Sequence, residues 1–579
     1  MTESSSIRGG NVTASAARGS IRWRTSLFGL ASIALSILVV FLVLFPLLRL
    51  LEISFFPAGV FDVSALRDVI GSAWLIDTVS NTLIVVAVSG TIAIPAGSLL
   101  AWLNERTDAS LRSVGELLPL IPILVPSIAM AIGWVFLASP GSGFLNGALT
   151  WLLLPLGYEA TIDIATWPGV IFAFTINAIP YVYLVVSGAL RNLDPAMEEA
   201  SRISGAGTWQ TFRRVSVPAI KPALAAAALL VTIIGFGNYS IAIIVAQRAG
   251  IDVISVRIFQ LLTVDYPPRF GQATVLCIFV LGIASSLWLL QRHFAQKGNF
   301  AVIGGRASQA SVVQLGRWKW AARVCMLVYF ACATLLPLFA LAVVALQPFW
   351  NVAISPSEFT LDNFRTAFVE HYVTRQAFLN SLLLAAAGGL AAIGVGSVIA
   401  LYARQSRSAL AKLADGVTKL PALFSHLSLA VGFLVAFAAA PFHLGGTTWL
   451  LLLAYVVIFM PEASIAANAA VAQIGNELIE ASAICGASEG RTFRKVIAPL
   501  MLPALVSGYA LVFILISGEV TASALLATND RPVIGYVIRS TWDGGSFGTL
   551  AALAGGFAFM NCIVALISFK LGKMRLRIP

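Results

Sequence analysis

Long apolar segments alternate with short polar ones along almost the whole chain. A helix needs about 20 apolar residues to cross the hydrocarbon core of a bilayer. Twelve segments of this sequence meet that requirement and predict membrane-spanning helices. They lie at 26–50, 78–103, 114–138, 166–190, 220–246, 270–294, 321–346, 378–403, 417–440, 447–472, 502–527 and 546–571. The pattern therefore predicts an all-α polytopic membrane protein.

The composition agrees with that fold class. Of the 579 residues, 59% are hydrophobic and only 11% are charged, whereas a soluble protein carries about 25% charged residues. No long polar segment remains to build a large water-soluble domain. Residues 1–25 are rich in Ser, Gly and Arg and predict a disordered tail. The apolar run that follows is too long for a cleavable signal and predicts the first membrane helix.

The two halves of the chain repeat each other. Between 199–224 and 480–505, 14 of 26 positions are identical without a gap, at an offset of 281. Nearer the start of each half the offset is 299, as between Gly133 and Gly432. Six helices is an even number, so the repeats run in parallel rather than inverted. We expect repeat 1 at 26–298, a linker at 299–318 and repeat 2 at 319–579.

The positive charges are distributed unevenly between the predicted loops. If the N-terminus is cytoplasmic, 28 of the 37 Lys and Arg residues fall on the cytoplasmic side. The positive-inside rule then places both termini, the linker and the loops 191–218 and 472–499 in the cytoplasm. The net charge of +11 therefore follows from membrane topology, and we expect no nucleic-acid partner.

Those two loops carry the same polar motif, which is Glu-Ala-Ser, three residues and Gly. Asp194 and Pro195 are suited to begin a short helix, and Gly205 can end it in the left-handed conformation. An ordinary charged connector would be enough to satisfy the positive-inside rule. It would not require Glu, Gly, Phe and Pro at identical spacing in two halves that have diverged elsewhere. The spacing favours two docking helices for a partner protein.

At these residues the chain resembles the membrane permeases of binding-protein-dependent ABC importers. Their signature is Glu-Ala-Ala, three residues, Gly, nine residues and Ile-x-Leu-Pro. The matching motif residues are Glu199, Ala200, Ser201, Gly205, Glu480, Ala481, Ser482 and Gly486. The resemblance implies a type I importer permease fold and a coupling helix in each loop. It implies as partners two copies of an ATPase subunit and a periplasmic binding protein, and a location in the bacterial inner membrane.

Members that fuse two permeases in one chain include iron(III)-type importers. Segments 180–195, 256–273 and 300–306 are similar to patterns in that subgroup. The resemblance implies ferric iron as substrate, with 2-aminoethylphosphonate, thiamine or polyamines as alternatives. A twelve-helix secondary transporter would also have two parallel six-helix halves, and a channel would show a pore loop. Neither needs two coupling-type loops.

The sequence offers no catalytic constellation. It has no GxxxxGK[ST] phosphate-binding loop, so ATP and Mg²⁺ are expected on the partner subunits and no cofactor on this chain. The four histidines and five cysteines show no metal-ligand spacing. We therefore expect a transport pathway rather than an enzyme, with no firm metal site.

Ionisable and polar residues inside predicted membrane helices are candidates for that pathway. Glu519 and Asn238 correspond at an offset of 281, as do Glu462 and Tyr181. Carboxylate and phenolate oxygens would suit a hard cation. Interhelical hydrogen bonds are an equal alternative for Glu519 and Glu462, and a structural role is favoured for Asn238 and for His426, which is predicted in the middle of a helix.

Overall fold

The computed structural model describes residues 27–110, 118–157, 160–297, 312–406, 408–487 and 489–575, and these are almost entirely helical. The long helices are α1 (Leu27–Phe55), α3 (Trp74–Arg106), α7 (Trp167–Arg191), α11 (Lys221–Gly237), α14 (Phe270–Lys297), α15 (Trp318–Phe330), α16 (Leu336–Leu346), α18 (Tyr372–Gln405), α25 (Ala498–Ser517) and α28 (Phe547–Arg575). The predicted tail and residues 299–311 of the linker lie outside the described residues.

Shorter helices connect or interrupt these. In the first half they are α2 (Ser64–Ile70), α4 (Ile121–Leu124), α5 (Ser127–Leu137), α6 (Phe144–Leu153), α8 (Pro195–Ile203), α9 (Thr208–Thr211), α10 (Val217–Ala219), α12 (Tyr239–Ile241) and α13 (Ile254–Thr263). In the second half they are α17 (Asp362–Arg365), α19 (Ala409–Val417), α20 (His426–Phe437), α21 (Thr448–Ile458), α22 (Met460–Ala472), α23 (Asn476–Ile484), α24 (Glu489–Thr492), α26 (Thr521–Leu526) and α27 (Ile534–Asp543).

Several predicted spans are broken rather than continuous. Within the described residues, eight helices are long and apolar enough to cross a membrane, or eleven if three bent pairs each count as one span. The third span of the second half bends by 114° before α20, and the fourth bends by 52° between α21 and α22, where Pro461 stands in the first turn of α22. The fifth spans stop at Gly237 and Ser517, before short helices begin.

Each half extends its first helix onto the other half. α1 packs against α20 of the second half, and α16 packs against α5 of the first half. Glycine makes both contacts close. A Cβ on Gly133 would lie 2.5 Å from the carbonyl oxygen of Pro337, and a Cβ on Gly432 would lie 3.2 Å from the Cβ of Pro46. Small residues allow such approach between membrane helices, so the two repeats interlock.

The end of the linker is also tied to the end of α3. Val313 donates its N–H to the carbonyl of Arg106 at 2.9 Å. The Asp108 carboxylate accepts the Leu315 N–H at 3.0 Å and pairs with Lys319 at 3.2 Å. The Leu315 hydrogen bond, helped by Lys319, lowers the pKa of Asp108 below its ordinary value. The carboxylate therefore stays ionised at neutral pH and holds this connection.

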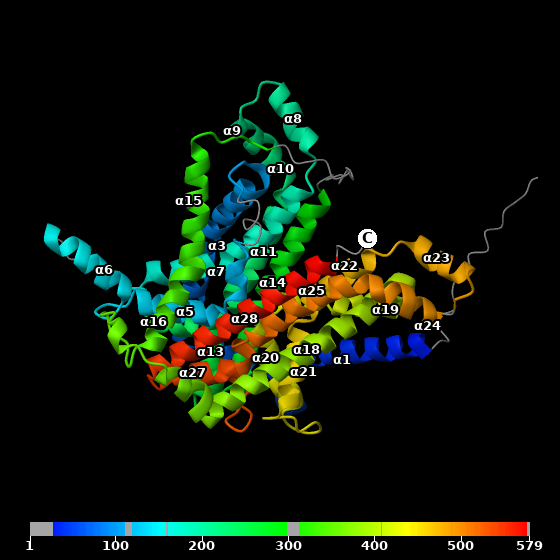
Figure 1. Ribbon diagram of the computed structural model, residues 1–579. Coiled ribbons are helices and arrows are strands. Elements are labelled where there is room, and N and C mark those ends of the chain that lie inside the picture. The colour runs from blue at the N-terminus through cyan, green and yellow to red at the C-terminus, as the bar shows by residue number, and fades with distance from the viewer. Residues whose placement is uncertain are drawn as a thin grey trace, which may run out of the picture.

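Figure 1 shows how these elements place the two motif loops. Helices α8 and α23 lie at the upper and right-hand ends of the molecule, each at the end of its own helix bundle. Helices α13 and α27 lie on the opposite, lower left side. The two loops therefore lie at two separate ends of the helical body, both away from α13 and α27.

Candidate functional site

Each motif loop is built by local capping chemistry. The Asp194 side chain accepts the Ala196 N–H at 2.9 Å, and Pro195 is the first residue of α8. After α8 the chain turns at Gly205, where φ is +85°, and after α23 at Gly486, where φ is +74°. Glycine adopts this left-handed conformation without steric cost. The predicted start of α8 at Asp194 and the glycine stops are therefore confirmed.

The motif side chains divide between an outer and an inner face. Glu199 and Ala200 are exposed on α8, and Glu480 and Ala481 are exposed on α23. The motif serines face inward. Ser201 Oγ lies 3.0 Å from Thr211 Oγ1, and Ser482 Oγ lies 2.8 Å from Thr492 Oγ1. Serine therefore braces each loop, while glutamate and alanine are presented outward.

Large apolar side chains accompany the exposed glutamates at equivalent positions. Ile203 is 87% exposed and Ile484 is 86% exposed. Met197 and Leu478 are also exposed, again at an offset of 281. A single exposed apolar residue needs no explanation. The same two positions are exposed on both loops, beside an exposed carboxylate, so each loop presents apolar and acidic side chains on its outer face.

Glu198, next to the motif glutamate, is buried instead. Its side chain is 3% exposed and lies 3.7 Å from Arg106 Nε, whose side chain is 2% exposed. Ser216 donates a 2.6 Å hydrogen bond to Glu198 Oε1. Removing one partner of such a buried pair costs ~3–5 kcal/mol. The sequence analysis did not predict the burial of Glu198. Its one sign in the sequence is a difference between the repeats, since the equivalent position 479 holds Ile.

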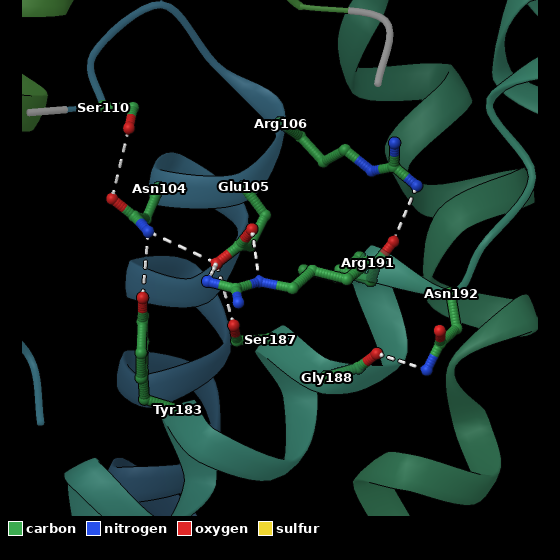
Figure 2. A network of polar contacts seen from close by, with 10 residues as sticks. Asn104, Glu105, Arg106, Ser110, Tyr183, Ser187, Gly188, Arg191 and Asn192 are labelled. Carbon is green, nitrogen blue, oxygen red and sulfur yellow. Dashed lines mark hydrogen bonds and ion pairs between the residues drawn. The ribbon is translucent and has the colours of Figure 1, made fainter. Parts of the chain in front are cut away.

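A polar network braces the membrane helices beneath the first loop, as Figure 2 shows. Glu105 of α3 accepts two 3.0 Å hydrogen bonds from Arg191 of α7 and a 2.8 Å bond from Ser187. Asn104 donates to the Tyr183 hydroxyl at 2.9 Å. Bidentate pairing of this kind fixes geometry as well as charge, so the ends of α3 and α7 are held together.

A second polar site lies where the broken helices meet in the membrane. Glu519 Oε1 accepts the Ala522 N–H at 2.8 Å, and Glu519 Oε2 lies 2.6 Å from His426 Nδ1. Glu519 therefore caps α26. His426 is the first residue of α20, which corrects its predicted position in the middle of a helix. A bend of 114° precedes α20, so the imidazole stands at a helix end.

The first half has an uncharged equivalent of this pair. Asn238 donates to Asn177 Oδ1 at 3.1 Å, and Asn177 donates to Ser127 Oγ at 3.0 Å. Asn238 also accepts the Ile241 N–H at 3.0 Å and caps α12. Asn238 corresponds to Glu519 at an offset of 281, and Ser127 to His426 at 299. Equivalent positions are thus neutral in one half and ionisable in the other.

The two groups lie side by side across the interface between the halves. A Cβ on Gly237 would lie 2.8 Å from the Cβ of Ser425, and one on Gly518 would lie 3.6 Å from Pro126 Cγ. These four residues directly precede Asn238, His426, Glu519 and Ser127. Asn238 and His426 thus follow one close contact between the halves, and Glu519 and Ser127 follow the other.

Tyr181 and Glu462 belong to the same region. Tyr181 of α7 interacts electrostatically with both Glu462 and Glu519 of the second half. Glu462 Oε2 is a buried atom without a hydrogen-bond partner. Among the described residues, no three His, Cys, Asp or Glu side chains are arranged to hold a metal ion. Together, Glu519, Glu462, His426, Tyr181 and Asn238 form what is called here the membrane polar cluster.

Comparison with known proteins matches both halves of the chain. Residues 93–297 and 392–571 each match the family described as "Binding-protein-dependent transport system inner membrane component". The chain is 22% identical over 544 residues to the ferric transport system permease protein FbpB of Actinobacillus pleuropneumoniae, covering 93% of this chain and 77% of the relative.

Two further similarities concern one half at a time. The chain is 30% identical over 258 residues to the putative 2-aminoethylphosphonate transport system permease protein PhnV of Salmonella paratyphi A, covering 45% of this chain and 95% of the relative. A crystal structure of a bacterial ABC transporter that imports alginate aligns with a TM-score of 0.40 at 22% identity, covering 47% of this chain and 96% of that chain.

Proposed function

The chain belongs to the family of binding-protein-dependent transport system inner membrane components, and from this premise we propose that it is the permease of an ATP-driven importer of ferric iron. The observation that carries the coupling mechanism is the duplicated loop. Both loops expose the same glutamate, alanine and apolar positions at a fixed offset. A repeated outward surface fits a partner that is itself present twice.

We infer that the partners at these loops are two copies of an ATPase subunit. Glu199 and Ile203 would contact one copy, and Glu480 and Ile484 the other. ATP and Mg²⁺ would be bound by those subunits, and this chain would supply movement rather than a catalytic group. A periplasmic binding protein would deliver the substrate to the opposite side, near α13 and α27.

The membrane polar cluster is proposed as part of the translocation pathway. Glu519, Glu462 and Tyr181 offer carboxylate and phenolate oxygens, which hard cations such as ferric iron prefer. Polar residues at membrane depth are costly and usually serve a pathway. The similarity to FbpB, named as a ferric transport system permease, supports the same substrate.

One observation favours 2-aminoethylphosphonate as a second candidate. The N-terminal ends of α5 and α20 lie beside the cluster, and helix N-termini favour anionic groups such as a phosphonate. A carboxylate such as Glu462 could pair with the amine of the same molecule. The similarity to PhnV is in accord with this alternative.

An uptake assay distinguishes these substrates. Proteoliposomes containing the full chain, its ATPase subunits and its binding protein are expected to accumulate radiolabelled ferric iron only when ATP is enclosed with the ATPase. A non-hydrolysable ATP analogue is the matched control. If the proteoliposomes accumulated labelled 2-aminoethylphosphonate but not ferric iron, the proposed substrate would be wrong. Uptake driven by an ion gradient in the absence of ATP would contradict the proposed mechanism.

We also propose that both termini and the linker face the cytoplasm of the bacterium. The bias of Lys and Arg predicts this orientation. Thr161→Cys and Gln314→Cys each place one cysteine at an exposed position in a chain whose native cysteines have been replaced. A membrane-impermeant thiol reagent added to whole spheroplasts is expected to label position 161 and not position 314. The reverse labelling pattern would contradict the orientation.

A further inference from the structure

The first half carries a helix, α6, that has no counterpart in the second half. α6 lies in the connection between α5 and α7, residues 138–166, whereas the equivalent helices α20 and α21 are joined by residues 438–447 alone. The far end of α7 leads into α8, so α6 lies at the end of α7 that is remote from the coupling loop. Figure 1 shows α6 extending on its own away from the helical body.

The base of α6 is held firmly. The side chain of Asn146 is buried, donates to the carbonyls of Ser139 and Ile162 at 2.8 Å each, and accepts the Ile162 N–H at 2.7 Å. A Cβ on Gly147 would overlap the side chain of Val352 in the second half. The base is therefore joined to the end of α5, to the segment that leads to α7 and to the other half, and these contacts fix the direction in which α6 projects.

Beyond this base, α6 exposes apolar side chains on all sides. Trp151 is 80% exposed and Leu152 is 59% exposed, and Leu154, directly after the helix, is 60% exposed. Successive residues of a helix are about 100° apart around its axis, so these three side chains point in different directions. Residues 140–157 include no charged residue. A helix that is apolar all round requires apolar surroundings.

Lipid acyl chains fit this surface better than a protein partner does. A docked protein would cover one side of α6 and leave the others in water, and protein interfaces have a polar rim that an uncharged helix does not match. Acyl chains surround a helix and need no hydrogen bonds from it. With ten residues, α6 is ~15 Å long, about half of the ~30 Å hydrocarbon core. It can therefore enter one leaflet but cannot cross the bilayer.

Two tryptophans indicate the depth of α6 in the membrane. Trp151 lies near the far end of α6, and Trp167 is the first residue of α7 and 37% exposed. Tryptophan is enriched at the boundary between lipid and water. Since the start of α7 marks this boundary on the side remote from the coupling loops, α6 belongs close to it.

We propose that α6 is immersed in the outer leaflet of the membrane, where acyl chains contact it on all sides, and that it anchors the first half in that leaflet. The word outer rests on the orientation proposed above, whereas the contact with lipid does not depend on the orientation or on the substrate. Because the base of α6 also contacts Val352 of the second half, the anchor acts where the two halves meet.

Fluorescent labels on opposite sides of α6 test this proposal. Thr150→Cys and Leu152→Cys are made singly in a chain whose native cysteines have been replaced. Both positions are exposed, and residues two apart point to opposite sides of a helix. The bimane-labelled full chain, with its ATPase subunits, is placed in vesicles of phosphatidylethanolamine and phosphatidylglycerol. We expect brominated acyl chains to quench both labels and iodide in the water to quench neither.

Two control positions calibrate the quenching. Leu383→Cys places the label at a position that is 67% exposed within α18, a membrane-spanning helix, and Thr161→Cys places it in the exposed segment after α6. Brominated lipid is expected to quench the labels at positions 150 and 152 as strongly as the label at position 383. Iodide is expected to quench only the label at position 161. Uptake by each labelled protein, compared with wild type, shows that the fold is intact.

Three results would overturn the proposal. Quenching of both α6 labels by iodide would show that the helix projects into water. Lipid quenching of only one of them would show a helix that is not immersed. Iodide quenching that disappears when the binding protein is added would assign α6 to docking that protein. An error in the proposed substrate would appear in the uptake assay and would leave the quenching of the labels unaffected.

Discussion

Replacing Glu199 and Glu480 together by lysine is expected to reduce ATP-driven uptake by about 100-fold, since a like charge or an unpaired charge in an interface costs ~2–5 kcal/mol. Both carboxylates are exposed at equivalent positions on α8 and α23. Among the described residues neither carboxylate is seen to bond within its own loop, whereas Ser201 and Ser482 each contact a threonine there. The measurement is uptake in proteoliposomes, together with co-purification of the ATPase subunits and the amount of permease in the membrane.

The control for this prediction is Gln210→Arg. Gln210 is exposed in the first loop, and its equivalent in the second half is Arg491, so the substitution adds a positive charge that the other loop already carries. We expect near-normal uptake from this variant. If Glu199→Lys combined with Glu480→Lys left uptake normal, the loops would be connectors and the proposed docking surface would be wrong.

The parts of these loops that the sequence predicted are those determined by neighbouring residues. Asp194 begins α8 by bonding the Ala196 N–H, and Gly205 and Gly486 end the helices with positive φ. Capping involves residues a few positions apart, so a short motif is sufficient to predict it. The burial of Glu198 was not predictable in this way. It depends on Arg106, which is distant in the sequence and reaches Glu198 only once α3 and α7 have packed together.

The membrane helices show the same limit. Hydropathy predicts the apolar segments but not the helix breaks before Asn238 and Glu519. At each break a polar side chain accepts an N–H of the next short helix, α12 or α26, in place of a lost backbone bond. Such a contact does not alter the hydropathy pattern. The repeat offset of 281 related Asn238 to Glu519. The relation of His426 to Ser127 requires the other offset, 299, and the contact between His426 and Glu519 requires the fold.

Within the membrane polar cluster, removal of the Glu519 charge is expected to have the largest effect on uptake. Glu519→Gln keeps an oxygen that can accept the Ala522 N–H and keeps the side-chain shape, but it removes the negative charge opposite His426. We expect ferric uptake to fall about tenfold, at the low end of the roughly 10–10³-fold by which a charged lining raises the local concentration of a counter-ion. Assembly and binding-protein-stimulated ATP hydrolysis should be unchanged.

A variant that relocates the carboxylate tests whether the pathway needs the negative charge itself or only the contact with His426. Asn238→Asp, combined with Glu519→Gln, moves one carboxylate from the second half to the equivalent position of the first half. Asn238 already accepts the Ile241 N–H, and aspartate can do the same. If a carboxylate in the cluster attracts the cation, the double variant should recover much of the uptake. No recovery, with normal assembly, would show that Glu519 acts by positioning His426. Unchanged uptake in Glu519→Gln alone would assign Glu519 to holding the helices together.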